Sequence, residues 1–156
     1  MAVSTKEIKK ILFPVDFTEN VDPVLSYVVT MAQTHQAEVL VLHVVQDLGR
    51  TSVSFIPHAN LDEFQRETEK HARDAMQQFV TGKGEQLDAL PGFDTAIVTG
   101  PPADTIVENA KKEQASLIIM GTHGRKGLEH FIMGSVAERV IRLSPIPVMV
   151  VNPETA

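Results

Sequence analysis

The chain has 156 residues, of which 43% are hydrophobic and 22% charged, and its formal net charge is −6 at pH 7. A chain of this length fits a single domain and can bury a core that needs no metal or disulfide bond. The acidic balance argues against broad binding to nucleic acid or to an anionic membrane, because both need a basic face. The lack of cysteine excludes disulfide bonds, thiol catalysis and cysteine-based metal sites.

The first ten residues, MAVSTKEIKK, are polar and lack the apolar core of a secretion signal. No apolar stretch in the chain approaches the roughly 20 residues that span a bilayer. We therefore expect a cytoplasmic protein without a membrane segment and without a nucleic-acid partner.

Hydrophobic patterns predict strands at residues 11–17, 38–45, 93–98, 116–120 and 148–151. The second of these strands is almost continuously apolar, which is typical of a central parallel strand buried on both faces. Helices are predicted between the strands. The first is expected to start with Asp22 as N-cap and Pro23 as its first residue, and the others cover residues 61–80, 103–110 and 136–143.

All four predicted helices have apolar faces that can be assigned from spacing. In the first helix this face consists of Val24, Leu25, Val28, Met31 and Ala32, and in the third it consists of Ala103, Ile106, Val107 and Ala110. The inward stripe predicted for residues 61–80 consists of Leu61, Phe64, Thr68, His71, Ala75 and Phe79. The inward residues predicted for the last helix are Val136, Val140 and Leu143.

Five strands alternating with four helices predict a single-domain α/β fold, a Rossmann-like doubly wound sheet of five parallel strands. Such sheets bind ligands at the carboxyl ends of the strands, where the strand order reverses. A reversal next to the first strand would place Pro14, Val15 and Asp16 beside the segment that follows the fourth strand.

That segment, MGTHGRKGLEHFIMGS at residues 120–135, carries the most specific signal in the chain. Gly121 and Gly124 would let backbone N–H groups approach an anion, and Gly134 would do so at the start of the next helix, where Ser135 is expected as N-cap. The residues alone leave two interpretations open, a phosphate-binding loop or a plain glycine-rich connection. Walker-type, dinucleotide G-x-G-x-x-G and G-x-S-x-G motifs are all absent from the sequence.

The spacing G-x-x-G, nine residues, then G-S is similar to the nucleotide motif of the universal stress protein family. The segments KKILFPVDF, VLVLHVV, IIMGTHGRKG, GSVAERVIR and PIPVMVV extend the resemblance over nearly the whole chain. The chain resembles the subgroup that binds ATP. The resemblance implies a homodimeric stress-response or regulatory protein that uses ATP as a conformational or signalling ligand.

The resemblance also implies which residues contact ATP. Asp16 would face the ribose, and Val44 would meet adenine through its backbone. The implied contacts are Pro14, Val15, Asp16, Val44, Met120, Gly121, Thr122, His123, Gly124, Arg125, Lys126, Gly127, Gly134, Ser135 and Val136. Any magnesium would enter with the nucleotide, because His123 and His130 lack a convincing metal-ligand spacing.

Several alternatives stay open at this level. Asp16 can instead be a turn residue that caps the residues after it. The same pocket can serve slow ATP hydrolysis or nucleotide transfer, although no catalytic residue can be assigned. The protein can also be a nucleotide-independent interaction module.

The last predicted strand is the expected site of contact with a second copy of the chain. The resemblance implies a homodimer through residues 148–151, which would pair a strand edge that is otherwise exposed. The alternative is an edge shielded by Pro145, Pro147 and the tail.

Overall fold

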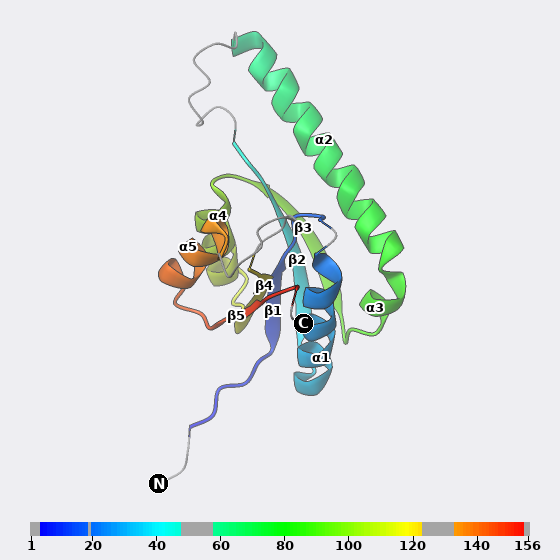
Figure 1. Ribbon diagram of the computed structural model, residues 1–156, viewed down its shortest axis with the longest axis vertical. Coiled ribbons are helices and arrows are strands. Elements are labelled where there is room, and N and C mark those ends of the chain that lie inside the picture. Colours follow the sequence, from blue (N-terminus) through cyan, green and yellow to red (C-terminus); the bar gives the residue numbers. More distant parts are fainter. Residues whose placement is uncertain (1–3, 19, 48–57, 123–132, 155–156) are drawn as a thin grey trace.

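The computed structural model describes residues 4–18, 20–47, 58–122 and 133–154. The elements are β1 (Lys10–Pro14), α1 (Val21–His35), β2 (Glu38–Val45), α2 (His58–Gly82), α3 (Gly84–Asp88), β3 (Phe93–Thr99), α4 (Pro102–Lys112), β4 (Leu117–Gly121), α5 (Ser135–Leu143) and β5 (Val148–Val151). The strands form one sheet in the order β3-β2-β1-β4-β5 (Figure 1). Every pairing is parallel, so the predicted sheet is confirmed. The short helix α3 adds to the four expected helices.

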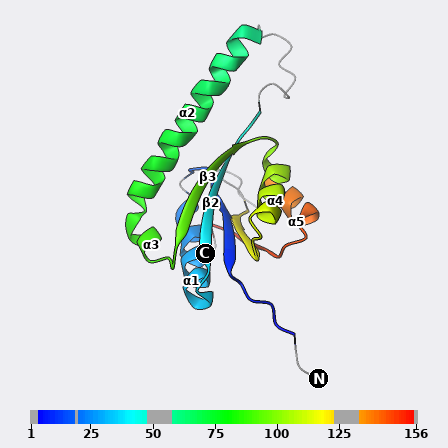
Figure 2. The ribbon, with the colours of Figure 1, turned by 180° about the vertical axis from the view of Figure 1, so that it is seen from behind.

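Helices cover both faces of the sheet, with α1, α2 and α3 on one side and α4 and α5 on the other (Figure 2). Side chains alternate between these layers along each strand. On β1, Ile11 and Phe13 join the core under α1, whereas Leu12 joins the core under α4 and α5. The inner strands are therefore buried on both faces, which explains their nearly continuous apolar sequences.

The strand order reverses at β1, which lies between β2 and β4. The register places Ile11 beside Leu117 and Leu12 beside Ile118. This arrangement confirms the predicted reversal, and the residues at the end of β1 line one pocket with the first residues after β4.

The helix starts differ from the predictions by one to three residues. α1 begins at Val21 with Asn20 as its N-cap, so the prediction that Asp22 is the cap was wrong. Asp22 lies in the first turn, where the positive end of the helix dipole stabilises its carboxylate, and it forms an ion pair with Lys83. In α5 the N-cap is Gly134, and Ser135 is the first helical residue rather than the predicted cap.

The inward face predicted for α2 was largely wrong. Its buried residues are Ala72, Met76 and Phe79, whereas Phe64 is 54% exposed and His71 is also exposed. α2 extends well beyond the end of the sheet (Figure 1), so its first half has no sheet surface to cover. Burial there is decided by what lies opposite the helix rather than by its spacing pattern.

The inward face of α5 also needs correction. Val140 is fully buried as predicted, but Val136 and Leu143 are 36% and 41% exposed. Ala137 takes the buried position next to the sheet instead. Within the described residues, no helix is both long and apolar enough to cross a membrane.

Candidate functional site

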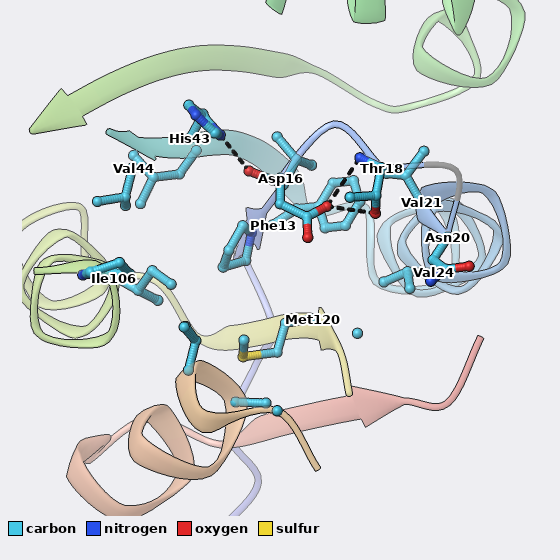
Figure 3. A pocket seen from close by; sticks show the side chains of 18 of the residues that line it. Phe13, Asp16, Thr18, Asn20, Val21, Val24, His43, Val44, Ile106 and Met120 are labelled. Atoms are coloured by element: carbon cyan, nitrogen blue, oxygen red, sulfur yellow. Dashed lines mark hydrogen bonds between the residues drawn. The ribbon is translucent and has the colours of Figure 1, made fainter. Parts of the chain in front are cut away.

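A pocket of about 610 Å³ opens at the carboxyl ends of β1, β2 and β4, where the strand order reverses (Figure 3). The first residues of three helices also line it, namely Val21 of α1, Pro102 of α4 and Ser135 of α5. Its volume falls within the range of about 300–1,000 Å³ that is usual for small-molecule sites. The fold therefore places this pocket where parallel sheets bind ligands.

The α4 side of the pocket is apolar. Met120 comes from β4, Ile106 comes from α4, and Val44 lies near the end of β2 (Figure 3). Met120 and Ile106 are themselves buried in the core under α4 and α5, so this wall is rigidly supported. Such a surface suits a flat, weakly polar ring.

The two ends of the glycine segment lie next to each other at the pocket. The N–H of Gly134 donates to the carbonyl of Thr122 over 2.7 Å, and the N–H of Thr122 donates to Val151 over 2.9 Å. Residues 123–132 connect these two ends, so His123, Gly124, Arg125, Lys126 and Gly127 lie outside the described residues.

The start of α5 supplies hydrogen-bond donors. No side chain caps this helix, and its first three residues, Ser135, Val136 and Ala137, all line the pocket. The N–H groups of a first turn have no partner within the helix and carry the positive end of its dipole. This end of the pocket is therefore suited to an anion.

Asp16 lies at the rim of the pocket with an exposed side chain. Its Oδ1 accepts hydrogen bonds from the backbone N–H of Thr18 over 3.1 Å and from the Thr18 hydroxyl over 2.8 Å. The turn role considered from sequence is thus observed. Its Oδ2 has no hydrogen-bond partner within the described part of the chain, so the same carboxylate can also accept a bond from a ligand.

An exposed ion pair joins the two helices on the α4 side of the pocket. Arg139 Nε and Nη2 donate to the two carboxylate oxygens of Asp104 over 3.0 and 3.1 Å. These hydrogen bonds lower the pKa of Asp104 and raise the pKa of Arg139 from their ordinary values. The pair links α4 and α5, whose starts both face the pocket.

Every predicted site residue that the structure describes lines this pocket. These residues are Pro14, Val15, Asp16, Val44, Met120, Gly121, Thr122, Gly134, Ser135 and Val136. Among the described residues, no group of three His, Asp or Glu side chains could hold a metal ion.

Sequence reasoning missed several lining residues, including Asn20, His43, Gln46 and Ile106. His43 carried a usable signal, since it is a polar residue inside the apolar run VLVLHVV and directly precedes Val44. Nδ1 of His43 lies 2.7 Å from the carbonyl oxygen of Val15 (Figure 3). The other missed residues come from turns and helices that only the fold brings to the strand ends.

A model of the universal stress protein family matches residues 7–152. This chain belongs to the universal stress protein family. It is 33% identical to a universal stress protein of Methanocaldococcus jannaschii, with 92% of this chain and 94% of the relative covered. It is 28% identical to the solved structure of the universal stress protein UspA from Lactobacillus plantarum, with a TM-score of 0.77 and with 95% of this chain and 100% of that chain covered.

Two more distant structures of universal stress proteins contain nucleotides. One is a complex with cAMP, at 19% identity and a TM-score of 0.59, covering 95% of this chain and 99% of that chain. The other, from Archaeoglobus fulgidus, is a complex with dAMP, at 21% identity and a TM-score of 0.65, covering 91% of this chain and 96% of that chain. At these identities the likeness shows the shared fold alone.

Proposed function

We propose that this universal stress protein binds ATP in the pocket at the switch point and acts as a homodimeric stress-response or regulatory protein. The observation that carries the proposal is the pairing of an apolar wall with an uncapped helix start across one pocket. Adenine needs an apolar slot, the ribose needs a hydrogen-bond acceptor, and the phosphates need N–H donors. Val44 and Met120 supply the apolar slot, Asp16 supplies the acceptor, and the first-turn N–H groups of Ser135 and Val136 supply the donors.

The glycine motif favours a triphosphate over a monophosphate. Gly121 and Gly134 lie at the two joined ends of the segment, and the first-turn N–H groups of Ser135 and Val136 lie at the same end of the pocket. His123, Gly124, Arg125, Lys126 and Gly127 are assigned to the phosphates by the family motif. Magnesium would arrive with ATP. The cAMP and dAMP complexes of related proteins support an adenine nucleotide in this fold.

Bound ATP acts in this proposal as a conformational or signalling ligand rather than as a substrate. No lining residue of the described pocket is an evident base positioned to activate water, and none of the described arginines can be assigned as an arginine finger. A nucleotide can shift a conformational equilibrium only when its affinity differs between the two states. The candidate for such a difference is the proposed dimer contact.

The homodimer is assigned to β5, which forms one edge of the sheet. Val148, Met149 and Val150 are only half-buried in the single chain. A second copy that pairs with β5 around a two-fold axis would cover these side chains and satisfy the free strand edge.

Thermal unfolding of nucleotide-free protein with ATP and magnesium tests the binding. At 100 times Kd, a ligand adds about 2.7 kcal/mol to the free energy of unfolding. For a chain of this size that corresponds to a rise in Tm of about 5–11 °C. No shift at millimolar ATP contradicts the proposal and favours a nucleotide-independent interaction module.

Two glycine variants sharpen the test. Gly134→Val should abolish the shift because it places a side chain where the phosphates bind, and its φ of −61° and ψ of 150° accept any residue. Gly92→Val is the matched control, since Gly92 lies at the opposite end of the sheet from the pocket and should keep the full shift. Multiple-turnover release of phosphate by wild type, lost in Gly134→Val, would instead establish an ATPase.

A further inference from the structure

We propose that His43 is a positioning residue for this pocket, because it fixes the backbone peptide that joins Val15 to Asp16. The inference rests on the proposed function, since it concerns how the same pocket recognises a ribose. His43 precedes Val44 on β2, and its ring lies on the layer that contains α1 and α2 rather than on the α4 side.

The first contact is a hydrogen bond to the residue before Asp16. Nδ1 of His43 lies 2.7 Å from the carbonyl oxygen of Val15, and the N–H of Val15 donates to Leu42 over 2.8 Å. A carbonyl oxygen only accepts, so Nδ1 of His43 carries the proton. β2 thus holds both the N–H and the carbonyl group of Val15, and thereby fixes the peptide that leads into Asp16.

The second contact is to the residue after Asp16. The rings of Phe17 and His43 have centroids 4.4 Å apart, and Phe17 also approaches Phe79 of α2 at 6.1 Å. Phe17 has a φ of 60°, a left-handed conformation that is unfavourable for an aromatic residue and persists only when its surroundings hold it. The ring contact with Phe17 orients the imidazole toward Val15.

His43 therefore touches both neighbours of Asp16 without touching its carboxylate. The turn made by Thr18 fixes Oδ1, and the Val15 peptide decides where Oδ2 points. Loss of the bond from Nδ1 frees that peptide, so the defect appears at the ribose end of the pocket and not at the phosphate end.

The experiment compares the Kd values of ATP and 2′-deoxy-ATP by calorimetry with nucleotide-free full-length protein. The ratio of the two values isolates the ribose contact, because a general loss of structure weakens both nucleotides alike. His43→Phe keeps a ring against Phe17 and removes the donor. His43→Asn keeps an N–H near the position of Nδ1 and removes the ring. Asp16→Asn is the reference variant, because it gives the Kd ratio expected when the proposed contact of the Asp16 carboxylate with the ribose is itself altered.

Wild type should prefer ATP over 2′-deoxy-ATP. His43→Phe should weaken ATP about tenfold, the scale of one hydrogen bond, and should bring the ratio down to that of Asp16→Asn. His43→Asn should retain the wild-type ratio. The double variant His43→Phe with Asp16→Asn should lose nothing more than either single variant, because both act on one contact.

The inference is overturned if folded His43→Phe keeps the wild-type preference for ATP over 2′-deoxy-ATP. It is also overturned if His43→Asn loses that preference as fully as His43→Phe does. Wild type that fails to bind ATP removes the proposed function together with this inference, whereas wild type that binds with an unchanged ratio in His43→Phe removes the inference alone. Circular dichroism establishes folding in each case. His43→Met, which also lacks the donor, replaces His43→Phe if that variant does not fold.

Discussion

Gly100 lies directly after β3 and leaves no room for a side chain. A Cβ atom at this position would lie 2.4 Å from Oγ1 of Thr105, which is only 6% exposed on the inner face of α4. Thr105 is β-branched and helical, so its side chain has few other rotamers. The N–H of Gly100 also donates to Val45 over 2.9 Å, which holds the backbone in place. This close approach sets how α4 begins beside the pocket.

Gly100→Ala should therefore lower the free energy of unfolding by about 1–3 kcal/mol, as overpacking does in other cores. Urea denaturation measures the loss. Gly92→Ala is the control, because its Cβ would meet only Glu38 Cγ at 3.8 Å, and it should stay within about 0.5 kcal/mol of wild type. Adding Thr105→Ala to Gly100→Ala should recover part of the loss. Equal stability of the two glycine variants would contradict the clash.

At the scale of elements, α2 divides into two parts with different roles. Ala72, Met76 and Phe79 bury its second half against the sheet, and Phe79 also contacts Phe17 below the pocket rim. Phe64 in the first half is 54% exposed, where the helix extends past the sheet (Figure 1). The same residue type thus occupies a buried and an exposed position on one helix.

Phe79→Ala should lower the free energy of unfolding by about 3–5 kcal/mol, because it removes a large side chain from the core. Phe64→Ala should change it by less than about 0.5 kcal/mol. Urea denaturation of both variants gives the comparison on one helix with one kind of substitution. A large loss in Phe64→Ala would mean that this half of α2 is covered in solution.

At the scale of the whole molecule, the sheet has two edges, formed by β3 and β5. Pro147 and Val151 direct their carbonyl groups to β4, and in a parallel strand this alternation leaves the backbone groups of Val148 and Val150 on the free edge. On β3, Gly92 and Gly100 bond to β2, which leaves Thr95 facing outward in the same way. Val150 and Thr95 are therefore matched positions for proline substitution, one on each edge of the sheet.

Val150→Pro should convert the proposed dimer to a monomer, because proline removes an outward N–H without breaking the pairing with β4. Size-exclusion chromatography with light scattering should give a mass of 17.1 kDa, the mass of one chain, in place of twice that value. Thr95→Pro changes the opposite edge and should leave the dimer intact. A folded Val150→Pro that stays dimeric would place the interface elsewhere.

Local patterns account for much of the fold. The ranges predicted for β2 and β5 match the structure, because a run of β-branched apolar residues has few other stable conformations. The glycine spacing likewise marked the pocket, since Gly121 and Gly134 prove to lie at its edge. Sequence reasoning went wrong where burial depends on a neighbour, as it did for Phe64, Val136 and Leu143.

The sequence by itself determined the alternation of strands and helices and the parallel sheet, and its resemblance to a known family identified part of the lining of the pocket. Apolar periodicity and glycine spacing are local properties of the chain, so they can be read without the fold. Only the tertiary structure decided that His43 binds Val15 and contacts Phe17, and that the first half of α2 extends past the end of the sheet. Those contacts join segments far apart in sequence, and their geometry is fixed by how the layers pack.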